Sequence, residues 1–137
     1  MSLITIGKGV ILRCGKDLVI LNFGILLFDI YKIVKIFNTT LVDMRFIQPL
    51  DDDLIIKLSE HHKYFVIIEK GIIKGGAGSG VNELFLNKNI LIIILNIGLP
   101  DMFIPSGNKD EICCEYKLDY YGIKEQILTW LSTLFAY

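Results

Sequence analysis

The 137-residue chain has no marked excess of either charge, few cysteines and no apolar segment long enough to cross a bilayer. Its 14 basic and 15 acidic side chains give a net charge of −1, which excludes the basic surface typical of nucleic-acid-binding proteins. The three cysteines include the adjacent pair Cys113 and Cys114, so neither a disulfide framework nor a CxxC metal or redox motif is present. The longest apolar run, residues 90–99, is shorter than the ~18 residues of a membrane span, and the sequence has no signal-peptide pattern. We therefore expect a cytoplasmic protein that binds neither nucleic acid nor membranes.

Apolar side chains, by contrast, are abundant. They make up 53% of the sequence and raise its mean hydropathy to +0.53, which is high for a chain of this length. Two explanations stay open: an apolar surface that meets a partner, or a compositional drift towards Ile, Lys and Asn, as in residues 88–96. The length fits one domain with its own core, so we predict a single domain over residues 1–137.

Apolar runs of strand length alternate with stretches of helical period. The runs at 64–69 and 90–97 are apolar on both faces, which is typical of parallel strands covered by helices on both sides. Residues 9–14 and 18–23 flank a Gly-Lys-Asp turn and predict a hairpin that adds one antiparallel strand at an edge. We therefore predict an α/β fold of three layers, α/β/α, with a five-stranded mixed sheet of four parallel strands and one antiparallel edge strand. The expected strands are 9–14, 18–23, 39–46, 64–69 and 90–97, and the expected helices are 25–38, 49–62, 81–88, about 110–117 and from about 121.

Two of the expected helices carry end and packing signals. In helix 49–62, Asp51 is a candidate N-cap, and an apolar set is expected to face inward: Leu54, Ile55 and Leu58. The helix from about 121 has an apolar stripe at helical spacing, as a helix docked on a sheet requires. The stripe consists of Ile123, Ile127, Leu131 and Leu134, with Trp130 close to it.

Two clusters look like metal or acid–base sites but have ordinary helix roles. Asp51, Asp52 and Asp53 stand where acidic residues favour the start of a helix. His61 and His62, the two histidines of the chain, would point about 100° apart on a helix and cannot chelate one metal together. We expect them to favour the end of the helix dipole instead.

The glycine-rich segment GGAGSGV, residues 75–81, resembles a phosphate-binding loop. A dinucleotide fingerprint starting at Gly76 and Gly78 would need a third glycine where Val81 stands, and a P-loop would need Lys and Ser or Thr where Val81 and Asn82 stand. Two readings remain. Gly76, Gly78, Ser79 and Gly80 could bind an anion at a helix start, or the glycines could allow a tight turn and close packing of helix on sheet, which we favour.

Polar groups also stand at the ends of two expected strands. Asp43 and Arg45 could form a structural ion pair or supply polar groups at the carboxyl end of their strand. Glu69 ends a strand just before the glycine segment, where it could be functional or could accept backbone N–H bonds from the turn. Cys113 and Cys114 are expected to be small core residues. These residues do not assemble into a nucleophile, base and oxyanion site.

Three longer segments resemble a known family. They are LVDMRFIQPLDDDLI (41–55), EKGIIKGGAGSGVNE (69–83) and LNIGLPDMFIPSG (95–107). Together they resemble the C-terminal domain of 1-deoxy-D-xylulose-5-phosphate synthases, enzymes of the transketolase superfamily. The likeness extends to residues 6–24 and 118–131 and so spans nearly the whole chain. The turn EKGIIK departs from the more acidic or smaller-residue turn common in the family, without consequence for the fold.

The resemblance implies a domain of a thiamine-diphosphate enzyme that condenses pyruvate with glyceraldehyde 3-phosphate, releases CO2 and supplies isoprenoid, thiamine and pyridoxal synthesis. In the family, a GDG-type motif of the first domain holds the diphosphate and Mg²⁺, and a glutamate of the second activates the aminopyrimidine. This sequence has no GDG, so Glu69 and Glu83 are not assigned that role. We expect no catalytic, cofactor-binding or metal-binding residue here, with thiamine diphosphate and Mg²⁺ bound by the missing domains. In a eukaryotic host, the expected location would be a plastid-type organelle.

Three functional hypotheses compete. The first is a fragment of the synthase, inactive alone, that packs on the remaining domains and extends a homodimer interface; Met1–Leu3 would then not be the natural start of the enzyme. The second is a regulatory module that binds phosphate or a phosphorylated metabolite with Gly75–Gly80 and the helix start at Val81. The third, a free-standing nucleotide-binding enzyme, is least favoured because the fingerprint fails.

Overall fold

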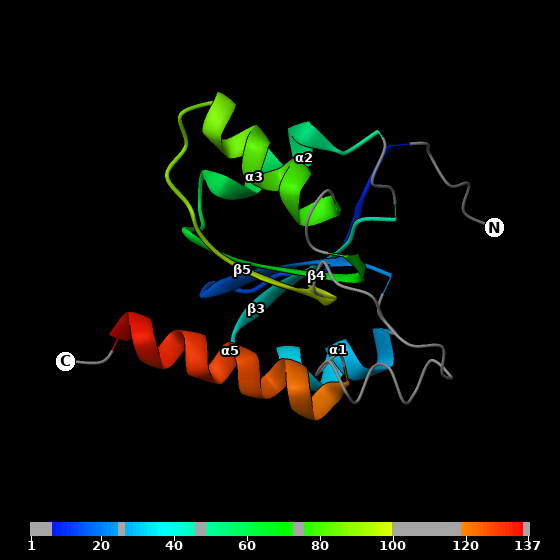
Figure 1. Cartoon of the computed structure of the whole chain (residues 1–137), viewed down its shortest axis with the longest axis vertical. Coiled ribbons are helices and arrows are strands. Elements are labelled where there is room, and N and C mark those ends of the chain that lie inside the picture. The colour runs from blue at the N-terminus through cyan, green and yellow to red at the C-terminus, as the bar shows by residue number, and fades with distance from the viewer. Residues whose placement is uncertain (1–6, 25–26, 46–48, 73–75, 100–118, 136–137) are drawn as a thin grey trace.

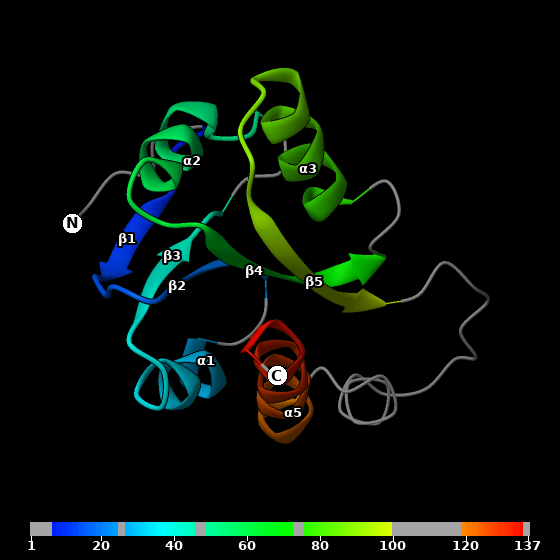
Figure 2. The ribbon, with the colours of Figure 1, turned by 90° about the vertical axis from the view of Figure 1, so that its left-hand side faces the viewer.

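Five strands form one mixed sheet in the computed structural model, which describes residues 7–24, 27–45, 49–72, 76–99 and 119–135. The strand order across the sheet is β1-β3-β2-β4-β5 (Figure 2). β1 runs antiparallel to β3 at one edge, and all other neighbouring pairs are parallel. The strands are β1 (Val10–Arg13), β2 (Leu18–Phe23), β3 (Thr39–Asp43), β4 (Tyr64–Ile72) and β5 (Ile93–Leu99).

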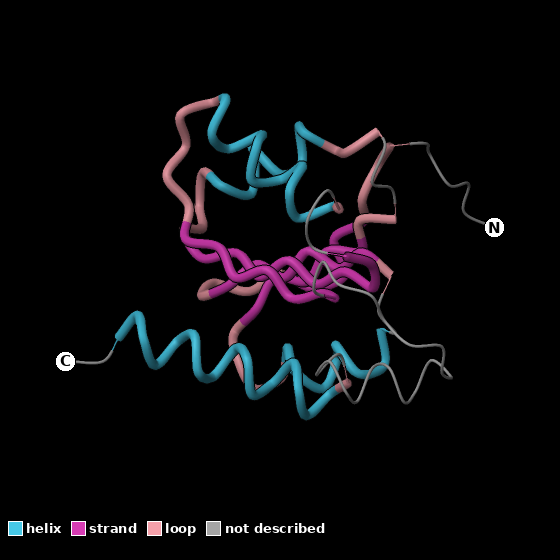
Figure 3. Tube along the Cα trace, in the orientation of Figure 1, coloured by secondary structure: helices cyan, strands magenta, loops and turns pink. Residues whose placement is uncertain are grey.

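Helices cover both faces of this sheet. One face carries α1 and α5, and the other carries α2 and α3, so the molecule has three layers (Figure 1 and Figure 3). The predicted α/β/α architecture and the mixed five-stranded sheet are therefore confirmed. The helix expected at about 110–117 lies outside the described residues. The described helices are α1 (Leu27–Val34), α2 (Asp52–Ser59), α3 (Ala77–Asn87) and α5 (Tyr120–Phe135).

The sheet separates two apolar cores. Along β2, Leu18 and Ile20 belong to the core under α1 and α5, whereas Val19 and Leu21 belong to the core under α2 and α3. This alternation is the period of two of a strand, and both sets are apolar because helices cover both faces. The expected stripe of α5 is confirmed up to Leu131: Ile123 and Ile127 are fully buried, and Trp130 and Leu131 pack at the margin of the same core, whereas Leu134 is only half-buried.

The start of α2 follows the sequence prediction. The Leu54 N–H donates to Asp51 Oδ1 at 3.3 Å, so Asp51 is the N-cap. Its other oxygen, Oδ2, accepts from the Gly9 N–H at 2.9 Å and so ties the segment before β1 to the start of α2. Ile55 and Leu58 are buried, which fixes the inward face of the helix.

The expected hairpin of the first two strands is wrong, because β3 lies between them. The segment between β1 and β2 instead crosses the start of β3. The Gly15 N–H donates to Thr40 Oγ1 at 2.9 Å, and this hydroxyl donates back to the Gly15 carbonyl at 3.0 Å. The Asp17 N–H also donates to the Asn38 carbonyl at 2.8 Å. Both sides of β2 are thus free for the parallel neighbours β3 and β4, and the antiparallel strand still lies at the edge, as predicted.

Candidate functional site

The four parallel strands end at one edge of the sheet, and polar side chains gather there. Binding sites of open α/β sheets lie outside the carboxyl ends of the strands. Asn22 is paired in register with Asp43, and Glu69 is paired with Phe23, one residue further along β2. Asn96, in the middle of β5, is paired with Ile67 of β4 and faces the start of α3. This carboxyl edge is therefore the candidate site.

Glu69 is the most constrained group of the edge. Its side chain is 2% exposed and lies on the same face of β4 as Ile67, under α3. The Ala77 N–H donates to Glu69 Oε2 at 2.8 Å, and the Gly78 N–H donates to Oε1 at 3.3 Å. The carboxylate thus binds the first backbone donors of α3 at the positive end of its dipole. The expectation that Glu69 could accept N–H bonds from the glycine turn is confirmed.

The glycine segment is the first turn of α3 and not a loop in front of it. The helix begins at Ala77, four residues before the expected start at Val81, and Gly76 is its N-cap. Gly76 has no side chain to cap the helix, and Glu69 supplies the acceptor from the neighbouring strand. The segment therefore forms a helix, although glycine has a low helix propensity.

The structure places all four candidate anion-binding residues at this helix start. Gly76 is the N-cap, and Gly78, Ser79 and Gly80 lie in the first turn. Two of the donors that an external anion would need, the N–H groups of Ala77 and Gly78, already bind Glu69. The Gly80 N–H donates to the Gly76 carbonyl at 3.4 Å, as in a regular helix. Anion binding here thus requires competition with an internal carboxylate.

Close packing explains the glycine at position 78. A Cβ added there would overlap Asn96 Oδ1 and would lie 3.2 Å from Glu69 Oε1. The Asn96 Oδ1 atom is buried, and no described residue donates a hydrogen bond to it. Sequence reasoning did not single out Asn96, although an amide within the apolar run 90–97 was a usable signal. Helix α3 and strands β4 and β5 thus meet at a small polar cluster of Glu69, Asn96 and Gly78.

Burial decides the charge preference of this cluster. Burial raises the pKa of the Glu69 carboxyl above its ordinary value, because a low-dielectric environment disfavours the charged form. The hydrogen bonds from the Ala77 and Gly78 N–H groups lower the pKa and so partly oppose this rise. Hydrogen bonds from the Ala77 and Gly78 N–H groups therefore hold the Glu69 carboxyl group in surroundings that disfavour its charged form.

The other polar groups of the edge lie on the opposite face of the sheet or at its rim. Asp43 and Asn22 share the face of α1 and α5, since Leu41 and Ile20, two residues earlier in each strand, belong to that core. Arg45 Nε lies 3.6 Å from Asp43 Oδ2, which confirms the predicted ion pair. Arg45 has a φ of 58°, in the left-handed region, where the chain turns away from β3. The sheet therefore keeps this pair apart from the Glu69 cluster.

The remaining predicted residues take structural positions or are not described. Asp52 and Asp53 form the acidic first turn of α2, as expected. His61 and His62 follow the end of that helix, and both N–H groups donate to the Leu58 carbonyl. Cys14 is an exposed free thiol, and Cys113 and Cys114 lie outside the described residues. In the described ranges, no three His, Cys, Asp or Glu side chains are placed to hold a metal ion, and no helix is long and apolar enough to span a membrane.

Comparison with known proteins gives consistent matches. The family described as "Transketolase, C-terminal domain" matches residues 7–123. The 1-deoxy-D-xylulose-5-phosphate synthase of Buchnera aphidicola subsp. Schizaphis graminum is 52% identical over 132 residues, covering 96% of this chain and 23% of the relative. The synthase of Erwinia tasmaniensis is 50% identical, covering 96% of this chain and 21% of the relative. The chain therefore spans less than a quarter of the length of these relatives.

A solved structure agrees with the fold. It is described as "Split gene transketolase, inactive beta4 tetramer", with a TM-score of 0.81 and 23% sequence identity. The match covers 92% of this chain and 43% of that chain. At this identity the likeness concerns the fold alone.

Proposed function

Because the chain belongs to the transketolase C-terminal domain family, we propose that it is the C-terminal structural and dimerisation domain of a 1-deoxy-D-xylulose-5-phosphate synthase. The observation that carries the proposal is the 52% identity across 96% of the chain to a synthase of which it covers 23%. The whole enzyme would use thiamine diphosphate and Mg²⁺ to condense pyruvate with glyceraldehyde 3-phosphate and release CO2, in the cytoplasm. The cofactor and metal would be held by the other domains, and this chain alone would be inactive.

The carboxyl edge supports a structural role for this chain. A thiamine-diphosphate site needs donors for the diphosphate, and the helix start that could offer them binds Glu69 instead. The polar cluster of Glu69, Asn96 and Gly78 holds α3 against β4 and β5 and so fixes the shape of this edge. In the proposed enzyme, the domain would present this rigid edge to its neighbours.

The opposite end of α3 and the start of β5 supply the apolar surface expected of an interface. Leu91 is 94% exposed and Leu86 is 75% exposed, and Ile93 at the start of β5 is also exposed. β5 is an edge strand of the sheet, and such edges are surfaces to which other chains add (Figure 2). We assign the homodimer contact of the proposed enzyme to this β5 edge, defined by Leu86, Leu91 and Ile93.

A hybrid synthase tests the proposal. If these 137 residues replace the matching region of the Erwinia tasmaniensis relative, we expect the hybrid to be active and dimeric. Introducing Leu86→Asp and Leu91→Asp together should weaken the dimer about tenfold, because each buries a charge in an apolar contact. Activity and dimer dissociation are measured by product formation and analytical ultracentrifugation.

The matched control for the hybrid is Ile11→Asp on β1, an exposed apolar residue of the opposite edge strand. This variant should leave the dimer unchanged. A stable, dimeric hybrid without activity would contradict the proposed function, and so would tight thiamine-diphosphate binding by the 137-residue chain in calorimetry. Equal weakening by both sets of variants would contradict the assignment of the β5 edge.

The alternative function, an anion-binding regulatory module, makes a different prediction. Glu69 already accepts hydrogen bonds from the Ala77 and Gly78 N–H groups. We therefore expect inorganic phosphate at about 10 mM, a concentration that would occupy a weak metabolite site, to leave the Gly78 and Ser79 amide resonances unchanged. The measurement is a phosphate titration followed by ¹H–¹⁵N correlation spectra. A saturable shift at these amides would favour the regulatory module.

A further inference from the structure

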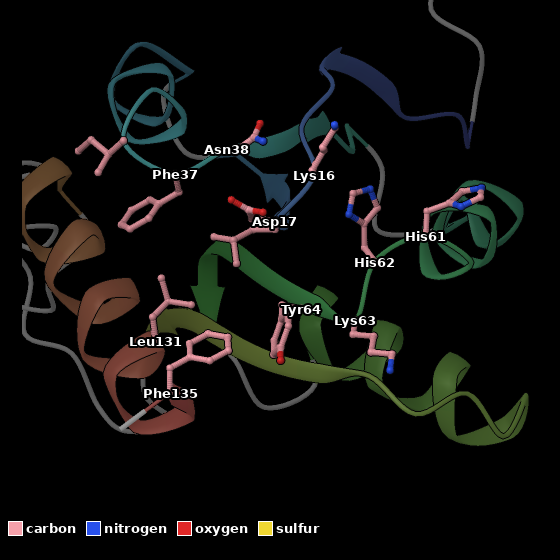
Figure 4. A pocket seen from close by; sticks show the side chains of 12 residues that line it. Lys16, Asp17, Phe37, Asn38, His61, His62, Lys63, Tyr64, Leu131 and Phe135 are labelled. Carbon is pink, nitrogen blue, oxygen red and sulfur yellow. The ribbon is translucent and has the colours of Figure 1, made fainter. Parts of the chain in front are cut away.

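A cavity of about 580 Å³ opens at the amino edge of the parallel strands (Figure 4). Glu69 lies towards the other end of β4. The cavity lies between the residues that follow α1, the last turns of α5 and the starts of β2 and β4. Its volume falls within the range of ~300–1,000 Å³ typical of small-molecule sites. Nothing in the proposed function uses this cavity, so its occupant has to be inferred from its walls.

One wall of the cavity is apolar and aromatic. Tyr64 and Phe135 form a tilted ring pair with centroids 5.6 Å apart, and Leu131 lies beside Phe135 (Figure 4). Trp130 also contacts Tyr64 edge to face, with ring centroids 6.3 Å apart. Phe37, after α1, lines the cavity from the side of that helix. Rings arranged in this way favour a flat aromatic occupant, which can stack or pack edge to face.

The facing wall carries the charge. In Figure 4 the carboxylate of Asp17 points into the space between Phe37 and His62, whereas the side chains of Lys16, His61 and Lys63 extend away from it. Burial, and after it the neighbouring His61, lower the pKa of His62, which favours its uncharged imidazole. Of the charged side chains that line the cavity, Lys16, Asp17 and Lys63, Asp17 is the one whose charged group points inward.

We propose that this cavity binds a small aromatic amine, with its ring between Phe37 and the Tyr64–Phe135 pair and its ammonium group on Asp17. The apolar wall provides the contact area, and the carboxylate selects a cation over an anion of the same shape. The proposal is independent of the proposed synthase function, because it uses no residue of the carboxyl edge or of the β5 edge.

The test uses benzylamine as the probe and benzoate as a ligand of similar shape and opposite charge. In a titration of the 137-residue chain, benzylamine should give saturable shifts of the Asp17, Asn38 and Tyr64 amides and leave Gly78 unchanged. Benzoate and benzyl alcohol should bind more weakly. Asp17→Asn should weaken benzylamine about threefold to fivefold, the effect of one solvent-accessible ion pair, and leave benzyl alcohol unaffected.

A variant that fills the cavity completes the test. Ile36 lies at the rim of the cavity and is 46% exposed, so Ile36→Trp can fill the space without disturbing the core and should abolish benzylamine binding. Absence of saturable shifts with benzylamine would overturn the proposal. Equal affinity for benzylamine and benzyl alcohol, unchanged in Asp17→Asn, would overturn it too, and would indicate an apolar socket for a side chain of another protein domain.

Discussion

Replacing Gly15 with alanine is expected to lower the free energy of unfolding by about 3 kcal/mol, the upper end of the usual cost of overpacking. A Cβ at Gly15 would lie 2.5 Å from the Thr39 carbonyl carbon, 2.6 Å from the Thr39 nitrogen and 2.7 Å from the Asn38 carbonyl carbon. These are backbone atoms at the start of β3, where Thr39 pairs in register with Leu18. Relief of the overlap would have to move β3 against β2 in the centre of the sheet. Urea denaturation measures the loss.

Gly80→Ala is the matched control for Gly15→Ala. A Cβ at Gly80 would meet the Leu50 side chain at 3.8 Å, an ordinary contact, and the residue lies inside α3. Alanine has a higher helix propensity than glycine by about 1 kcal/mol, so this variant should be as stable as the parent chain or more stable. Similar losses of unfolding free energy for both variants would contradict the overlap of Gly15→Ala with β3 as the cause of the loss.

Glu69→Ala is the second change with a large expected effect, a loss of about 3 kcal/mol in the free energy of unfolding. The substitution leaves the Ala77 and Gly78 N–H groups without an acceptor, and hydrogen bonds to a charged group contribute about 1.5–3 kcal/mol each. The desolvation of the wild-type carboxylate offsets part of this contribution. The start of α3 should fray, which amide hydrogen exchange at Ala77 and Gly78 reports directly.

Glu69→Gln separates charge from shape at the same position. Because the folded-state pKa of Glu69 is raised above its ordinary value of 4.5, the part of its contribution that depends on protonation is fully present below about pH 4.5 and is lost as the pH rises through the folded-state pKa. The advantage of the wild type over Glu69→Gln should therefore shrink between acidic and neutral pH. An advantage that grew with pH would show that the N–H bonds outweigh burial.

The sequence predicted those features of the fold that depend on local pattern. Asp51 caps α2, and Ile123 and Ile127 are buried, because a cap and an amphipathic stripe are encoded within a few residues. The hairpin prediction also depended on a local pattern, and it was wrong. A Gly-Lys-Asp turn indicates a change of direction, but it carries no information that residues 39–43 will enter the sheet between the two strands.

The candidate site was predicted less completely than the fold. Glu69 was recognised as an acidic residue at a strand end with two possible roles, and the choice between them depended on where α3 begins. That start depends in turn on contacts across three elements, since Gly78 admits the close approach of Asn96 from β5. Sequence periodicity does not report such approaches, because it describes each element separately.

Helix α5 also has a consequence for synthesis on the ribosome. It packs on α1 and β5 and supplies Ile123 and Ile127 to the core that contains Ile20 and Val66. A nascent chain exposes its earlier segments first and lengthens by about 5–20 residues per second. β2, α1 and β4 therefore emerge before α5, and the part of this core that α5 supplies is missing until residues 120–135 have been made. A translation product that stops before residue 120 would present a broad apolar surface to chaperones and proteases.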